Sequence, residues 1–175
     1  HLGDPLVLAK RWEAEGARIV HVVDLDAALG LGENIGVIEE IVRALKVPVQ
    51  VGGGIRSLDK ARTLFDKGIS RIFLGSLAFK EPSAVKTLLE EFGEDRVAAA
   101  LDNVEGVVMI CGWKTSTNVT VGDAVAMFSK LGIKLFLVTS VTRDGTLSGP
   151  DLETLAWICR RGVRVIAAGG IRRLE

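Results

Sequence analysis

The chain has 175 residues, of which 48% are hydrophobic, and its 22 basic residues balance 22 acidic ones. This length allows one substantial core and no shift in composition marks a second domain, so residues 1–175 are predicted to form a single domain. The balanced charge argues against a broad electrostatic attraction to nucleic acid or to an anionic membrane, and no apolar run approaches the ~20 residues of a membrane-spanning helix.

Helical and extended patterns alternate along the whole chain. Asp4 and Pro5 start a predicted helix that ends near Gly16, and the apolar run 18–26 follows as a buried strand. The later predicted strands cover residues 47–52, 69–75, 97–102, 134–139 and 163–168, with a short ribbon at 107–111. The later predicted helices cover residues 36–45, 58–67, 82–92, 121–131 and 152–161.

One motif occurs twice, 116 positions apart. Residues 49–59 are VQVGGGIRSLD and residues 165–175 are VIAAGGIRRLE, a pattern typical of a buried strand, a tight turn and a helix. Such a turn directs backbone N–H groups toward a ligand and suits a phosphate, so Gly53 and Gly54, and again Gly169 and Gly170, are predicted to bind phosphate. For either copy alone, the alternative is that the glycines only let the helix pack close to the strand. The repetition predicts a ligand with two phosphates.

The alternation of strands and helices predicts an α/β fold with a parallel sheet and right-handed crossovers. An open flavodoxin-like sheet would show the same alternation. The repeat, and the polar residues at the carboxyl end of nearly every strand, favour a (β/α)8 TIM barrel of two half-barrel repeats, with about six of the eight βα units in this chain.

The carboxyl ends of barrel strands form the active site, and they carry the candidate residues here. Asp102 ends an apolar strand, and partial exclusion of water at that strand end suits a general acid. An Asp there could instead cap the next segment through its side chain. Thr139 could orient a substrate oxygen, or could simply be a good strand residue. Trp113 could stack on a planar ligand or anchor its loop. Further candidates for binding the substrate or its phosphates are Arg56, Gly75, Ser76, Asp144 and Gly145.

The two cysteines, Cys111 and Cys159, have no CxxC spacing and no nearby histidine. No metal site is therefore predicted, and both are expected to be small, buried, apolar thiols. Reduced thiols favour a cytoplasmic location.

The chain resembles the family of the histidine-biosynthesis isomerase HisA. The motifs that carry the resemblance are HVVDLD (residues 21–26), GGGIRS (52–57), LD (101–102), CGW (111–113), Thr139 with RDGTLSGP (143–150), and AGGI (168–171). The resemblance implies an Amadori rearrangement of phosphoribosylformimino-AICAR phosphate (ProFAR), an aldose, to its ribulosyl form, without metal or redox cofactor. It also implies that Asp102 protonates the ring oxygen while Thr139 positions the reacting groups.

Several alternatives stay open at this point. The related cyclase HisF shares the repeat and the glycine loops, and a dual enzyme would also isomerise phosphoribosylanthranilate. The family's first strand, with its catalytic base, and its last strand are expected outside residues 1–175. From a different class, the chain could therefore be an inactive, phosphate-binding partial barrel that self-associates through open sheet edges.

Overall fold

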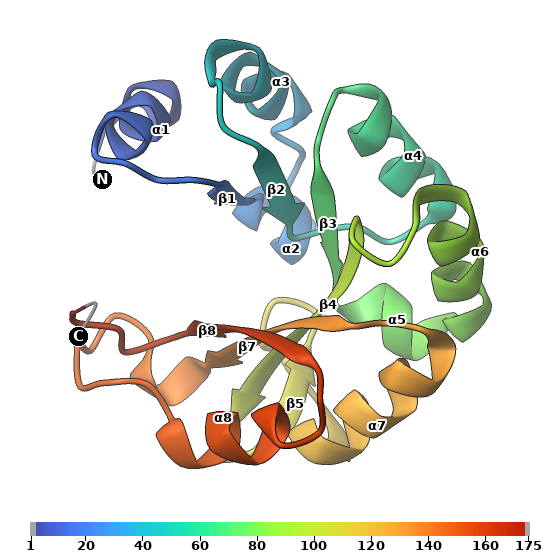
Figure 1. The fold of residues 1–175 in the computed structure, drawn as a ribbon. Helices are drawn as coiled ribbons and strands as arrows, with labels where there is room; N and C mark the ends of the chain where they lie inside the picture. Colours follow the sequence, from blue (N-terminus) through green and yellow to red (C-terminus); the bar gives the residue numbers. More distant parts are fainter. Residues whose placement is uncertain (1–2, 174–175) are drawn as a thin grey trace. The chain divides into compact units, whose positions relative to one another are not determined.

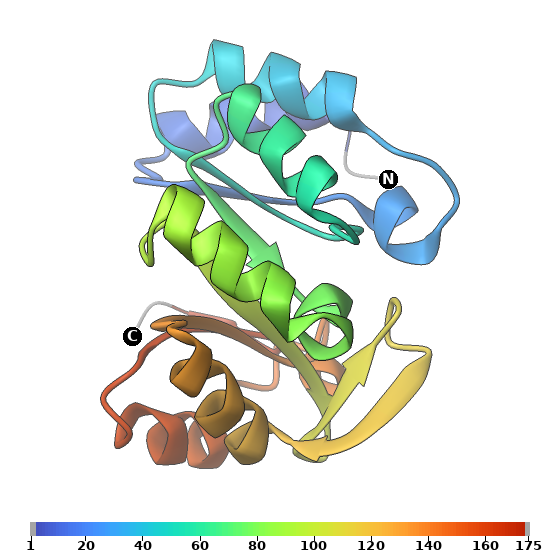
Figure 2. The ribbon, with the colours of Figure 1, turned by 90° about the vertical axis from the view of Figure 1, so that its right-hand side faces the viewer.

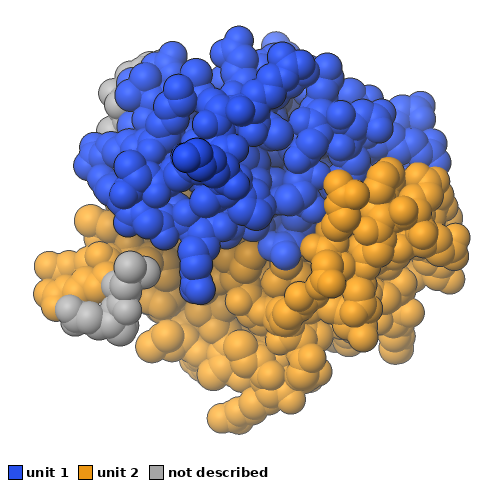
Figure 3. All heavy atoms as spheres, turned by 45° about the horizontal axis from the view of Figure 1, so that its top comes forward, with its two compact units in different colours: residues 1–73 blue, residues 74–175 orange. Residues whose placement is uncertain are grey.

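The computed structural model describes residues 3–173. Its contacts divide the chain into two compact units, residues 1–73 and residues 74–175 (Figure 3). The two units are described separately below. The expectation of a single domain stays a prediction.

The first unit is a three-stranded parallel sheet with helices between its strands (Figure 1). Strand β1 pairs with β2, and β2 pairs with β3. The Asp4 carboxylate caps the first helix by accepting hydrogen bonds from two backbone N–H groups, with Pro5 at the first helical position. The elements are α1 (Pro5–Ala14), β1 (Val20–Val23), α2 (Leu25–Leu29), α3 (Ile35–Ala44), β2 (Val49–Gly52), α4 (Leu58–Asp66) and β3 (Arg71–Leu74).

The second unit combines three parallel strands with an antiparallel ribbon. Strand β7 lies between β4 and β8 and is parallel to both, whereas β5 pairs antiparallel with β4 and with β6. In Figure 2 the yellow strands β5 and β6 extend away from the helices of this unit. The elements are α5 (Ser76–Lys80), α6 (Pro82–Phe92), β4 (Val97–Val104), β5 (Val107–Ile110), β6 (Thr115–Thr120), α7 (Val121–Leu131), β7 (Leu135–Ser140), a 3-10 turn (Val141–Arg143), α8 (Leu152–Cys159) and β8 (Arg164–Ala168).

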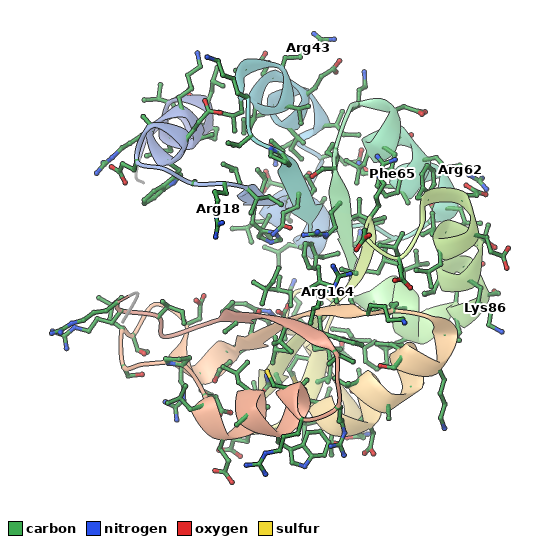
Figure 4. All side chains as sticks on the ribbon, viewed as in Figure 1. Arg18, Arg43, Arg62, Phe65, Lys86 and Arg164 are labelled. Atoms are coloured by element: carbon green, nitrogen blue, oxygen red, sulfur yellow. The ribbon has the colours of Figure 1, made fainter. Side chains whose placement is uncertain are left out.

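The core of the second unit lies between its central strands and helices α6 and α7. Leu101 and Phe136, on neighbouring strands, and Phe128 on α7 are fully buried, and the Phe128 ring packs edge-on against Phe79. Fully burying a side chain of this size contributes roughly 1.5–3 kcal/mol. By contrast, long basic side chains such as Arg43 on α3 and Lys86 on α6 extend from the helices (Figure 4). This buried apolar packing supports β4 and β7, whose carboxyl ends carry candidate site residues.

The prediction of an α/β chain with βα units of a (β/α)8 barrel is confirmed, with two sets of three parallel strands. The predicted helices at 82–92 and 121–131 have the observed bounds. Four elements were not predicted: the short helices α2 and α5, the 3-10 turn Val141–Arg143, and strand β6. No helix in the described part of the chain is long and apolar enough to cross a membrane.

The expectation of two buried thiols is wrong. Cys159 is exposed at the end of α8, and Cys111 is only partly buried. Cys111 follows strand β5 in a left-handed backbone conformation, with φ at 56°, which places it in a loop and not in the core.

Candidate active site

Asp102 and Thr139 are neighbours at the carboxyl ends of β4 and β7. The parallel register pairs their Cα atoms, so both side chains lie on the same face of the sheet, with strands about 4.8 Å apart. Thr139 is only 8% exposed, while Asp102 is partly buried. The structure therefore brings together the two residues predicted to be catalytic, and a substrate oxygen on this face could contact both.

Trp113 comes to the same place from the connection between β5 and β6. Its indole Nε1 donates a hydrogen bond of 2.8 Å to Oδ2 of Asp102. The backbone reaches this position through left-handed residues, with φ at 56° for Cys111 and at 65° for both Gly112 and Trp113. Because 43% of the Trp113 surface remains exposed, the ring is also free to stack on a planar ligand.

The glycine loop of the second unit packs tightly against two other segments. A Cβ atom on Gly169 would lie 2.4 Å from the backbone oxygen of Ser140, and one on Gly170 would lie 2.3 Å from that of Gly149. Both glycines are left-handed, with φ at 87° and 76°, and the Gly149 N–H donates to the Gly170 carbonyl over 2.8 Å. Glycine is therefore required at both positions by space and by conformation.

The first unit repeats this packing. A Cβ atom on Gly53 would lie 2.5 Å from the backbone oxygen of Asp24, and one on Gly54 would lie 2.3 Å from the Cβ of Ala27. Asp24 precedes Ser140 by the same 116 positions that separate Gly53 from Gly169, so the repeated motif makes repeated contacts. Close packing explains why these residues are glycine, and phosphate binding stays a prediction. Leu174 and Glu175, which end the second copy of the motif, lie outside the described residues.

Asp24 has a structural position at the end of β1. Its buried carboxylate accepts hydrogen bonds from the backbone N–H groups of Ala27 and Asn34 and from the Asn34 side chain. Burial alone would raise the pKa of Asp24, but these hydrogen bonds and the charge of Lys60 outweigh it and lower the pKa. Asn34, which carries two of the three bonds, lies in a loop where no sequence pattern indicates its role.

The remaining predicted binding residues have varied surroundings. Arg56 donates to the Ala28 carbonyl over 3.0 Å, at the end of α2. Ser76 Oγ accepts the Cys111 N–H over 3.1 Å, which links it to the loop that carries Trp113. Asp144 and Gly145 are exposed in the loop after β7. Gly75 lies between β3 and α5, and a Cβ atom added to it would meet no atom of the described residues within 4 Å, apart from its chain neighbours.

Comparison with known proteins adds independent information. The family model described as histidine biosynthesis protein matches residues 1–175. Proteins from Cenarchaeum symbiosum (strain A) and Thermomicrobium roseum are 41% identical over 169 residues and 42% identical over 170 residues. Each match covers 96% of this chain, and 72% and 70% of the relative. A protein from Nitrosopumilus maritimus is 37% identical over 176 residues, covering 98% of this chain and 73% of the relative. All three are named 1-(5-phosphoribosyl)-5-((5-phosphoribosylamino)methylideneamino) imidazole-4-carboxamide isomerase.

Proposed function

The chain belongs to the histidine biosynthesis protein family as one of its isomerases, and from this premise we propose that it acts on the phosphoribosyl imidazole carboxamide for which its relatives are named. The reaction is an Amadori rearrangement, in which an aldose bound through nitrogen becomes a ketose. The observation that carries the proposal is the pairing of Asp102 and Thr139 on one face of neighbouring strands, with the Trp113 indole on the carboxyl group.

Asp102 is the general acid in this mechanism. It protonates the ring oxygen of the sugar as the bond from that oxygen to C1 breaks, which leaves a protonated Schiff base between C1 and the nitrogen. Loss of the proton at C2 to a base then gives an enolamine, which tautomerises to the ketose. The Thr139 hydroxyl, on the neighbouring strand, positions the oxygen of the substrate that faces Asp102. All atoms of the substrate are retained, as an isomerisation requires.

The glycine loops bind the phosphates in this proposal, one for each loop. Gly53 and Gly54 belong to one loop, and Gly169 and Gly170 to the other. In both, we infer that backbone N–H groups of the turn that follows the strand bind the anion. We also assign phosphate binding to Gly75, Ser76 and Arg56. The loop over the substrate contains Asp144 and Gly145, and Trp113 stacks on the planar imidazole of the substrate.

An assay in deuterated water tests the proposal. The native gene product is incubated with the aldose substrate and the product is followed by NMR. We expect the ketose to form with a solvent-derived deuteron at C1, because the proton lost from C2 exchanges with water before C1 is protonated. Absence of the ketose would contradict the proposed function, and a ketose without solvent deuterium would contradict the proton transfer through an exchanging base.

We also propose self-association and a cytoplasmic location. Within residues 3–173, β1 pairs only with β2 and β8 only with β7, and unpaired strand edges recruit further strands. Light scattering of the chain should give a mass above that of the monomer that rises with concentration, and a monomeric mass at every concentration would contradict this. The cytoplasm is supported by the two cysteines, which form no disulfide.

A further inference from the structure

Asn103 is a buried polar residue that the proposed mechanism does not use. It follows Asp102 on β4 and is 2% exposed. Because side chains alternate along a strand, Asn103 lies on the opposite face from Asp102, where it lines a small internal space with Thr154 and Leu155 of α8. A buried amide requires hydrogen-bond partners, since leaving one of its polar atoms unpaired costs roughly 1–3 kcal/mol.

The Asn103 side chain has two partners, on different segments. Its Nδ2 donates to the backbone oxygen of Thr139 over 2.9 Å, which joins the ends of β4 and β7. Its Oδ1 accepts the backbone N–H of Gly106 over 3.2 Å, in the turn that joins β4 to β5. This turn is left-handed at Glu105 and at Gly106, with φ at 49° and 79°. The Asn103 amide therefore links the end of β7 to the turn between β4 and β5.

Each of these bonds leads to one of the two groups that surround the Asp102 carboxyl. The first fixes the backbone of Thr139, whose side chain shares the face of Asp102. The second fixes the start of the ribbon β5–β6, whose connection carries Trp113 to Oδ2 of Asp102. Both groups approach Asp102 from one side of the sheet, while Asn103 anchors both from the other.

We propose that Asn103 is a positioning residue for the isomerisation. Its side chain sets the distance from Asp102 to Thr139 and the position of the loop that carries Trp113. The inference rests on the proposed function, because Asp102 and Thr139 must be the reacting pair. It concerns the orientation of reacting groups, for which a displacement of about 1 Å can cost about 100-fold in rate. The two hydrogen bonds of this amide go to Thr139 and Gly106, which belong to neither glycine loop.

The test compares Asn103→Leu with Asn103→Ser in the native gene product. Leucine fills similar space without either hydrogen bond, and serine is a smaller polar residue that cannot reach both partners. For both variants we expect kcat to fall about 10- to 100-fold while KM stays within about threefold, because positioning acts on the transition state more than on binding. Asn103→Ser keeps the test decisive if leucine prevents folding.

A matched control separates positioning from stability. Val97→Ala removes fully buried volume from the same strand at its other end, away from the candidate site. It should lower the melting temperature by at least as much as Asn103→Ser, with kcat within about twofold of the wild type at a temperature where both are folded. If a folded Asn103 variant keeps the wild-type kcat, or if Val97→Ala loses kcat to the same degree, the inference is wrong. An inactive wild type would instead contradict the proposed function.

Discussion

The indole N–H of Trp113 donates a hydrogen bond to Oδ2 of Asp102 over 2.8 Å, although the two residues are eleven positions apart in the sequence. This is the one hydrogen bond that the Asp102 side chain makes within residues 3–173. In the proposed mechanism, Oδ1 is therefore the oxygen that faces the substrate. We propose that Trp113 orients the acid and that its partly exposed ring also offers a surface for the imidazole.

Replacing this indole separates its two roles. Trp113→Phe keeps an aromatic face but removes the N–H donor, so kcat should fall about tenfold, which corresponds to about 1.4 kcal/mol and is the order expected for loss of one hydrogen bond, with little change in KM. Trp113→Ala should in addition raise KM, because the stacking surface is lost. Steady-state kinetics measure both, with Trp12→Phe on α1 as the control. An unchanged kcat in Trp113→Phe would show that the hydrogen bond does not orient the acid.

The second glycine loop makes a prediction about stability. Gly169→Ala places a Cβ atom 2.4 Å from the Ser140 oxygen at a left-handed φ of 87°. Gly162→Ala is the matched control. Gly162 is also left-handed, with φ at 71°, but apart from its chain neighbours no atom of residues 3–173 lies within 4 Å of that Cβ position. We expect the control to lose about 1–2 kcal/mol of unfolding free energy from backbone strain alone, and Gly169→Ala to lose more. Urea denaturation measures both losses, and equal values would mean that the loop relaxes freely.

The hydrogen bonds to Asp24 make stability depend on pH. The pKa of Asp24 is lower in the folded chain than its ordinary value of 3.8, so the unfolded chain takes up the proton first as the pH falls. The stabilisation is thus complete above the ordinary value and is lost as the pH falls through the folded value. Asp24→Asn should cost about 1.5–3 kcal/mol at pH 7, and the difference from the wild type should shrink below about pH 4.

Urea denaturation between pH 3 and pH 7 measures this difference. Asp26→Asn is the control, because Asp26 is exposed and, within residues 3–173, its side chain accepts a single bond, from the Asn34 side chain over 2.9 Å. It should cost less than Asp24→Asn at pH 7. A difference between Asp24→Asn and the wild type that stays constant over the whole pH range would contradict the assignment of a lowered pKa to Asp24.

Local signals in the sequence were sufficient for most of the fold. Pro82 and Gly93 mark the ends of α6, and apolar residues recur at helical spacing between them. Helix α2 was not predicted because residues 18–26 were assigned to one strand. In the structure the strand ends at Val23, and the Asp24 carboxylate caps the helix by accepting the Ala27 N–H. Strand β6 was missed because Thr115–Thr120 is polar and exposed, and pairing with β5 alone makes it a strand.

The candidate site was predicted residue by residue, but its connections were not. Asp102, Thr139 and Trp113 each had a signal of their own, namely a polar residue at a strand end or an aromatic residue in a loop. The hydrogen bond between Trp113 and Asp102 depends on how far the β5–β6 ribbon folds back, which no local pattern specifies. No local pattern indicates the role of Asn103 either, since both of its partners are backbone groups that any residue could supply.

Turnover of the relatives' substrate by the wild type and by Asp102→Asn, measured side by side, tests the central claim most directly. The amide keeps the shape of the side chain but cannot act as the acid, so turnover should fall about 100- to 10,000-fold while substrate affinity stays nearly unchanged. Asp59→Asn removes one carboxylate from the exposed surface of α4 and should leave turnover unchanged. An Asp102→Asn enzyme that turns over at the wild-type rate would contradict the role of Asp102 as the acid and the active site built around it.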